Sequence, residues 1–529
     1  MNVIRRGGVA LFALALVAGA CGDDGGGGTK AATGATAATA SGTSAASGTG
    51  GTGATAATGA KGIFATDARG GVYSAFQSTF DRSKDPFSSL TEFCTAAPST
   101  ATRKATDAAS ADSITIVHLR TKLEQLQQIG FAIPVGNVPD MFETFTRYIN
   151  EKCGGINGRK IKLELVEVNS QSTTLDADRR AACIAATEDL KTPIVINSTG
   201  LQGTAIPCIS IEHDALLFTS TSGEESWTKD SKGRIKSNAP TLDEFVRNLS
   251  SELIRQGVLK DKKIAVIVAD TPGQKEALDK GLIATLDKAG IKVVQYDTIG
   301  CKGGSVCTEG TPASVDKLIS NGINVLFAPG LNVVSLPQYV KEMATKGIKV
   351  GQIQIYNSNF NSGAGDLVAS KIPEFGGDDA GKLYNGTISI DPAPTGILRI
   401  GTYQKPAFNA MCEKTYNENN KTGEKWDYGT EETNSRAGMV ATVCGFVRMA
   451  ARTIYLAGDN PTRADLLKAA ENLGPVDTSN QEPSTFKPGK PSGFDTQFQL
   501  KYVYPCPAVG SGFKGCYVPA SNMPTVIPR

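Results

Sequence analysis

The chain has 529 residues, which is more than one small domain requires, so several domains or one large bilobed body are expected. Its formal net charge at pH 7 is +2. This near neutrality argues against a basic face for nucleic acid and against a polybasic segment for an anionic membrane surface. We therefore expect no nucleic-acid partner.

The first residues have the pattern of an export signal. Arg5 and Arg6 precede an apolar stretch from Val9 to Val17 that is too short for a permanent membrane helix, and small residues then lead to Cys21. A cysteine in this position resembles the lipobox of bacterial lipoproteins. The resemblance implies that residues 1–20 are a signal peptide, and that Cys21 anchors the protein by lipid on the extracytoplasmic face of a bacterial membrane. The alternative is an ordinary signal cleaved nearby, with Cys21 an unmodified thiol.

Two further segments precede the main body. Residues 31–60 contain only Ala, Thr, Gly and Ser, which cannot bury enough apolar surface to offset the entropy of ordering. Residues 21–60 are therefore expected to be the lipidated cysteine and a flexible tether. Residues 61–111 contain several aromatic residues that could pack on the body, and the sequence gives them no functional interpretation.

From about residue 113, strand-like and helix-like segments alternate. Residues 114–117 resemble a strand, Pro139 opens a helix, and Gly154-Gly155 ends it. Further strands are predicted at 161–168, 193–197, 264–269, 292–296, 324–328 and 352–356, with helices at 179–190, 245–253, 274–289, 312–320 and 336–346. No segment after the signal has the uninterrupted apolar length of a transmembrane helix. This alternation predicts parallel sheets with right-handed crossovers, divided between two doubly wound α/β lobes.

Cysteine usage agrees with export. Ten cysteines remain besides Cys21, and an even number in an exported chain favours disulfides. Zinc is the competing interpretation, but the chain has no CxxC pair and only two histidines, so no metal or other cofactor is expected. Sequence alone does not fix the pairing. The pairs we expect are Cys301–Cys307 and Cys506–Cys516 as local bridges, then Cys183–Cys208, Cys412–Cys444 and, by elimination, Cys94–Cys153.

One glycine-rich turn carries a family resemblance. The segment Ile149–Ile161, with the letters INEKCGGINGRKI, closely resembles the signature of type I periplasmic binding proteins, with Cys153 as an insertion. The branched-chain amino-acid-binding proteins of ABC importers are the most similar group. Asp270–Gly273 resembles a second turn of that family, and Ser492–Asp495 resembles its closing segment. The glycines of the first turn are expected to be structural, because they lead the chain from a helix into a strand.

The resemblance implies a two-lobed, Venus-flytrap architecture with three hinge crossings. It assigns residues 112–237 and 390–490 to lobe 1 and residues 242–385 and 492–529 to lobe 2, with hinge segments near 237–240, 388–391 and 493–495. A small ligand would bind between the lobes, and the partners would be that ligand and a membrane permease. A monomer is expected.

The candidate binding residues follow two predicted strands, because open α/β sheets bind ligands at the carboxyl ends of their strands. One group is Ser198, Thr199 and Gly200, and the other is Thr219, Ser220, Thr221 and Ser222. Both match places where the family presents hydroxyl and backbone N–H groups to a ligand carboxylate. The alternative is that these hydroxyls only cap the helices that follow.

Five other residues complete the candidate site. Trp227 could form an apolar wall or could simply pack in the core, and Phe131 lies where the family often places an aromatic residue. Asp270, Asn357 and Asn359 follow strands of the second lobe. Family members that bind α-amino acids commonly have an acid where this chain has the amides, and an aromatic residue at Pro272. A ligand with carboxylate, amide or hydroxyl groups and no ammonium group is therefore equally compatible.

The sequence favours binding over catalysis. No GxSxG elbow, HExxH motif or P-loop is present, and two histidines leave little room for a histidine-based triad. We therefore expect no enzyme, and a solute-binding lipoprotein that delivers an amino-acid-like, amide or organic-acid ligand to an ABC importer. The alternative is a ligand-sensing receptor module that is not coupled to transport, since the fold alone does not choose between these uses.

Overall fold

A computed structural model describes residues 90, 101–133, 135–221, 223–360, 363, 365–393, 395–396, 407–425, 431–476, 484–490, 492–507, 513–520 and 525–526. All of them belong to one unit of the chain, Ala56–Arg529. The signal peptide, Cys21, the tether, Cys94, Ser222 and most of the segment 61–111 lie outside the described residues.

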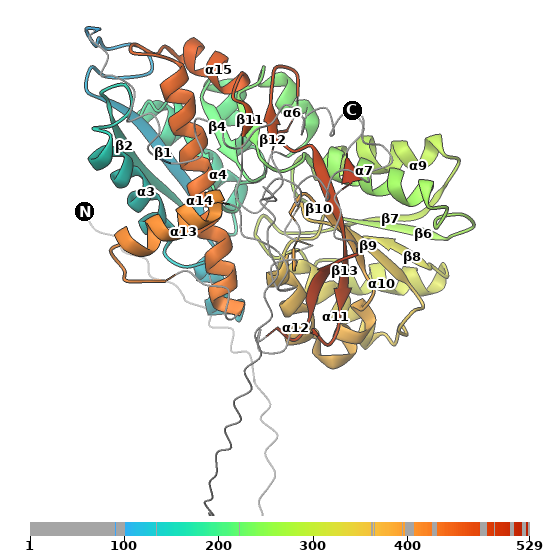
Figure 1. Ribbon diagram of the computed structural model, residues 1–529. Coiled ribbons are helices and arrows are strands. Elements are labelled where there is room, and N and C mark those ends of the chain that lie inside the picture. Colours follow the sequence, from blue (N-terminus) through green and yellow to red (C-terminus); the bar gives the residue numbers. More distant parts are fainter. Residues whose placement is uncertain are drawn as a thin grey trace, which may run out of the picture. The chain divides into compact units, whose positions relative to one another are not determined.

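The first sheet has five parallel strands in the order β2-β1-β3-β4-β5 (Figure 1). Its elements are β1 (Ser113–Lys122), η3 (Leu123–Ile129), α3 (Val138–Lys152), β2 (Lys160–Asn169), α4 (Leu175–Ile184), η4 (Ala185–Asp189), β3 (Ile194–Asn197), α5 (Ala205–Pro207), η5 (Cys208–Glu212), β4 (Leu216–Thr219), α6 (Glu225–Asp230) and β5 (Ile235–Ser237). The predicted strands and helices of this region are present. Phe142, Phe145 and Ile149 of α3 are fully buried, as their helical spacing predicted.

The second sheet has the path β14-β13-β10-β9-β8-β6-β7, with β15 paired to β13. Its elements are α7 (Leu242–Arg255), β6 (Ile264–Ala269), α8 (Gln274–Leu278), η6 (Asp279–Ile283), α9 (Ala284–Lys288), β7 (Val293–Ile299), α10 (Thr311–Ser320), β8 (Val325–Phe327), α11 (Ser335–Thr345), β9 (Gln354–Ser358), α12 (Asp366–Tyr384), β10 (Ile388–Asp391), β13 (Thr496–Val503), β14 (Cys516–Pro519) and β15 (Thr525–Val526). The strands β7, β6, β8, β9 and β10 are parallel, but β13 is antiparallel to β10, β14 and β15. The purely parallel sheet predicted from the alternation therefore gains an antiparallel edge.

The remaining helices return to the first sheet. They are α13 (Ala407–Asn419), α14 (Glu431–Leu456) and α15 (Arg463–Glu471), and a small antiparallel pair of β11 (Gly474–Val476) and β12 (Ser484–Phe486) follows. Residues of α13, α14 and α15 share one hydrophobic core with α3 and with β1, β3 and β4. The chain thus passes between the two sheets three times: after β5, after β10 and before β13. The residue boundaries drawn for the two lobes stay a prediction.

Helix α14 corrects one expectation. Within the described residues, the stretch Gly438–Leu456 is long and apolar enough to cross a membrane by length and composition alone, and 72% of it is buried inside the protein. Its side chains Val443, Phe446 and Val447 lie in the core beside the first sheet. The apolar run therefore serves as a core helix in this structure.

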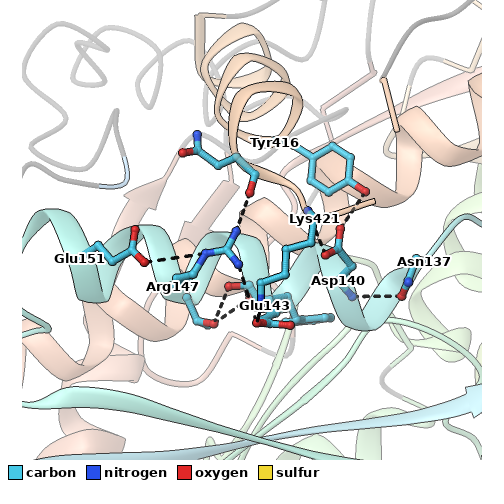
Figure 2. Close-up of polar contacts among 10 residues, drawn as sticks. Asn137, Asp140, Glu143, Arg147, Glu151, Tyr416 and Lys421 are labelled. Carbon is cyan, nitrogen blue, oxygen red and sulfur yellow. Dashed lines mark hydrogen bonds and ion pairs between the residues drawn. The ribbon is translucent and has the colours of Figure 1, made fainter. Parts of the chain in front are cut away.

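Polar contacts hold α13 against α3 (Figure 2). The buried carboxylate of Asp140 accepts hydrogen bonds from the Tyr416 hydroxyl at 3.4 Å and from the Lys421 amide at 3.3 Å. Lys421 also forms an ion pair with Glu143, and Arg147 donates to a carbonyl at the end of α13. These contacts fix a segment that follows the second sheet in sequence onto a helix of the first.

Four disulfides join pairs of cysteines that both lie within the described residues, and all four are pairs expected from the sequence: Cys183–Cys208, Cys301–Cys307, Cys412–Cys444 and Cys506–Cys516. Cys183–Cys208 joins α4 to η5, and Cys412–Cys444 joins α13 to α14. Cys153 is also disulfide-bonded. Its expected partner, Cys94, lies outside the described residues, so that pair stays a prediction.

The residues of the glycine-rich turn after α3 have structural roles. Asn157 donates its side-chain amide to the carbonyls of Ile454, Tyr455 and Gly458 at 3.1–3.3 Å, and so satisfies the C-terminal end of α14. Arg159, 1% exposed, donates to carbonyls in the 104–110 segment and in the loop after α14. At Gly155 a Cβ atom would lie 1.9 Å from a carbonyl oxygen of the same turn, and φ is +99°. The turn is therefore a structural clamp.

We predict that Arg159→Met lowers the free energy of unfolding by about 2–4 kcal/mol, because three carbonyls lose the charged donor that the buried guanidinium provides. Ligand affinity should not change, since the turn precedes β2 and lies at the opposite end of the strands from their carboxyl ends. Urea unfolding monitored by circular dichroism measures the effect. Lys162→Met, which changes an exposed side chain on β2, is the control. Equal stability of Arg159→Met and the parent would contradict the clamp.

Candidate ligand-binding cleft

The hydroxyl-rich ends of β3 and β4 lie side by side, because these strands are parallel neighbours with Asn197 opposite Thr219. Ser220 donates its hydroxyl to the Ser198 carbonyl at 3.3 Å. The Thr219 hydroxyl donates to the Thr221 carbonyl and accepts from the Thr221 amide, both at 3.0 Å. Ser220 therefore joins the two strand ends, and Thr219 fixes the turn that follows β4.

The described residues of the two hydroxyl groups do not cap the helices that follow them. The N-cap residues of α5 and α6 are Thr204 and Glu224, and neither makes a side-chain capping hydrogen bond. Thr199 and Gly200 instead contact the end of β1, where the Thr121 hydroxyl donates to the Gly200 carbonyl at 3.0 Å. The hydroxyl runs are thus strand-end contacts in this structure.

A buried histidine, His118, contacts Ser198. The His118 ring lies on β1, stacks on Phe142 at 3.9 Å between centroids, and places Nε2 3.3 Å from the Ser198 hydroxyl. Burial, with Arg120 nearby, lowers the pKa of His118 to about 3, so the ring is neutral near pH 7. His118 was not among the predicted site residues, because a histidine in an apolar strand shows no sign of its partners in the sequence.

A small cavity lies where segments after β3 and β4 meet segments after β6 and β9. Its described lining residues are Gln202, Gly203, Ile206, Thr221, Gly223, Trp227, Leu242, Thr271, Pro272, Gly273, Gln274 and Phe360. The free space is about 10 Å³, roughly room for one water molecule. A larger ligand therefore requires the two sides of the cavity to move apart.

Two predicted site residues, Thr221 and Trp227, line this cavity. The Trp227 ring lies against Gly223 and Gly273, where an added Cβ atom would come within 2.5 Å and 2.7 Å of the indole. Both glycines have positive φ. The tryptophan therefore packs against a turn of the first sheet and a turn of the second, and it also lines the cavity.

The other predicted residues that the structure describes are not among those that line the cavity. Phe131 stacks on Phe375 of α12 at 4.0 Å between centroids, and Asp270 is exposed at the end of β6. Asn357 is buried in the second sheet, where its side-chain amide donates to the Tyr384 hydroxyl at 3.1 Å. Asn359 donates to Asp391 at 2.5 Å. The predicted Asp270, Asn357 and Asn359 lie at or after the ends of β6 and β9. The lining residues Thr271, Gln274 and Phe360 follow the same two strands but were not predicted, and neither was Gln202.

Asp391 at the end of β10 is a buried carboxyl beside the predicted Asn359. It is 1% exposed and accepts hydrogen bonds from the Ala393 amide at 2.9 Å and the Thr395 hydroxyl at 3.4 Å, besides that from Asn359. Burial raises the pKa of Asp391 to about 7. A carboxyl that is largely protonated below neutrality thus lies on one of the segments that pass between the sheets.

Polar contacts also join the two sides of the cleft. In the loop closed by the Cys301–Cys307 disulfide, the Gly303 carbonyl accepts from the Leu175 amide at 2.9 Å, and the Ser305 hydroxyl donates to the Ser170 carbonyl. Elsewhere Lys280 forms an ion pair with Glu224 at 2.9 Å. Opening the cleft would break these contacts.

We predict that Asp391 makes the protein less stable as the pH rises from about 4 to about 7. The unfolded chain ionises this carboxyl near pH 3.8, while the folded chain binds the proton up to about pH 7. In Asp391→Asn, stability should no longer fall with pH through this carboxyl. Burial also raises the pKa of Asp243, to about 6, so Asp243→Asn should flatten the slope below pH 6 and keep it between pH 6 and 7.

Thermal unfolding of the parent and the two variants over this pH range separates the two carboxyls. His118 acts in the opposite sense, because its lowered pKa makes stability fall as the pH drops below about 6.5, and it is common to all three proteins. If Asp391→Asn and the parent have the same slope between pH 6 and 7, the assignment to Asp391 is wrong.

No protein-family model and no curated protein matches the sequence. Solved structures do match. A solute-binding protein of an ABC transporter from R. palustris, in complex with 4-hydroxybenzoate, is 14% identical with a TM-score of 0.54, over 78% of this chain and 98% of that chain. A fatty acid ABC transporter substrate-binding protein from Thermomonospora curvata has the same identity and TM-score, over 79% and 94% of the two chains.

A branched-chain amino acid ABC transporter protein from Thermus thermophilus with bound valine is 13% identical, with a TM-score of 0.54 over 79% of this chain and 97% of that chain. At these identities the likeness establishes the fold alone. The chain therefore has the two-lobed α/β fold of the type I periplasmic binding proteins, as its glycine turn and its strand–helix alternation predicted.

Proposed function

We propose that this chain is an extracytoplasmic solute-binding lipoprotein that captures a small ligand between its lobes and delivers it to the permease of an ABC importer. The observation that carries the proposal is the cavity between the strand ends of the two sheets, lined by hydroxyl, amide and aromatic groups. Pockets in open α/β sheets lie at such strand ends. The matched structures are solute-binding proteins, and this supports a binding role over catalysis.

The residues around the cavity narrow the ligand class. The matched proteins bind an aromatic acid and valine, and one is named for fatty acids, so the fold accepts chemically different ligands. Among the described residues that line the cavity here, none carries a charge. A buried ammonium or carboxylate would have no ionic partner at this place. We therefore favour a ligand whose buried end is an amide, hydroxyl or other uncharged polar group.

A thermal-shift screen of the mature chain against amides, aromatic and aliphatic acids, amino acids and polyols tests binding. A ligand at a hundred times its dissociation constant adds about 2.7 kcal/mol of stability. Uptake of the ligand found, in cells with and without this chain, then tests delivery. Uptake that does not depend on the chain would count against import and favour a sensor.

We predict that Thr221→Ala weakens binding of the ligand found in the screen, because Thr221 lines the cavity and no described residue is hydrogen-bonded to its hydroxyl. The loss should be about 0.5–1.5 kcal/mol for an uncharged partner and about 1.5–3 kcal/mol for a charged one. Calorimetric titration measures this loss. Thr219→Ala is the matched control, since it removes a turn hydrogen bond and should lower the melting temperature with less effect on affinity. Unchanged affinity in Thr221→Ala would remove it from the site.

We also predict that Cys21 anchors the mature protein in the membrane. Several acyl chains on one residue anchor a protein stably, so the parent should fractionate with membranes. Cys21→Ser should be released or remain unprocessed, as judged by fractionation and gel migration. A Cys94→Ser variant controls for the loss of a cysteine as such and should stay with the membrane. If Cys21→Ser behaves like the parent in both assays, the lipoprotein assignment is wrong.

A further inference from the structure

We propose that Gln274 and Trp227 form a subsite that selects a flat, uncharged ligand group with a hydrogen-bond donor and an acceptor, with a carboxamide as the best match. This inference rests on the proposed function, because it names the ligand chemistry for the same cleft. It goes beyond that function by assigning the choice of ligand to one amide and one indole.

Gln274 provides the polar half of the subsite. It is the first residue of α8, is 4% exposed and lines the cavity. Its Oε1 is buried and has no hydrogen-bond partner, and no described residue is bonded to the rest of its side-chain amide. A buried amide in this state is unfavourable unless something supplies its bonds. A ligand that enters the cavity can supply them.

The chemistry of an amide defines its best partner. A glutamine side chain offers two N–H donors and one carbonyl acceptor, and it can rotate to exchange them. A ligand carboxamide offers the same set, so the two groups can pair through two parallel hydrogen bonds. An ammonium group can only donate and a carboxylate can only accept, so each leaves part of the Gln274 amide unpaired.

Trp227 provides the apolar half. Its indole contacts Gly223 and Gly273 and lines the cavity, and Ile206, Leu242 and Phe360 line the same space. An aromatic wall favours a planar group in an offset or edge contact. The ligand part that reaches Gln274 is therefore expected to be flat.

The charges nearby are already engaged. Lys280 is paired with Glu224 at 2.9 Å, and Lys275 is paired with Asp279 at 2.6 Å. Asp270 is exposed to solvent at the end of β6. An ionised ligand group in the cavity would lose its water without gaining an opposite charge. The lining thus excludes ions by desolvation and accepts a neutral group by hydrogen bonding.

Four probes that share one ring test the inference: benzamide, benzoate, benzylammonium and benzamidinium. Calorimetric titration of the mature chain with millimolar probe should give benzamide the highest affinity, by about tenfold over each of the ions. Gln274→Met, which keeps the bulk and removes the amide, should abolish this preference. Trp227→Ala should weaken all four probes.

Gln274→Glu gives a gain-of-function arm. At mildly alkaline pH the carboxylate can pair with an amidinium through two charge-assisted hydrogen bonds, so benzamidinium should bind this variant more tightly than benzamide. The matched control is Gln295→Met. Gln295 is 5% exposed, but its amide is bonded to Asp297 and to the Ser314 carbonyl, away from the cavity. That control should keep the parent's preference even where its melting temperature falls.

The outcomes distinguish failure of this inference from failure of the proposed solute-binding function. Equal binding of benzamide and either benzoate or benzylammonium overturns it, and so does an unchanged preference in Gln274→Met. A solute from the wider screen that binds while none of the four probes does overturns the subsite and leaves solute binding intact. No binding by any solute overturns both. If Gln274→Met fails to fold, the probe series on the parent and the reversal in Gln274→Glu still decide.

Discussion

The parallel register of β1, β3 and β4 determines what the polar strand ends can do. Pairing of 116–118 with 194–196, and of 194–197 with 216–219, places the residues after each strand within hydrogen-bonding reach of the next. The hydroxyls of Thr121 and Ser220 accordingly bond to carbonyls at neighbouring strand ends, and the Thr219 hydroxyl bonds to the Thr221 backbone within its own turn. Groups used in this way are unavailable to a ligand until the ends rearrange. Thr221, the residue after Ser220, lines the cavity.

Buried polar groups need hydrogen-bond partners, and this requirement distinguishes the structural turn Gly154–Arg159 from the cavity. In the glycine turn the side chains of Asn157 and Arg159 satisfy carbonyls at the end of α14 and in the loop that follows it. In the cavity the Gln274 amide lies nearly buried with its hydrogen bonds unmade. Satisfied groups give rigidity, and an unsatisfied group gives affinity for whatever completes it. The turn thus has its polar groups satisfied within the protein, whereas the cavity has a polar group that a ligand can satisfy.

The sequence predicts the frame far better than the site, for physical reasons. A short continuous apolar run and an amphipathic helical spacing are both local patterns, so β6 and α3 could be located from the sequence alone. The glycine turn was predictable because its positive-φ positions demand glycine. The stack of Phe131 on Phe375 and the bond of Asn359 to Asp391 join residues far apart in sequence, and no local pattern records them. The antiparallel edge formed by β13 was missed for the same reason.

Closure of the two lobes on a ligand depends on the same cavity residues. The free space beside Trp227 admits about one water molecule, so binding a solute requires the contacts between Gly303 and Leu175 and between Lys280 and Glu224 to open and form again. A ligand shifts such an equilibrium only by its difference in affinity for the two forms. A group that completes the Gln274 amide and lies on Trp227 can contact both sides only when they are close, and so favours the closed form. Selection of the ligand and closure of the lobes would then be consequences of the same contacts.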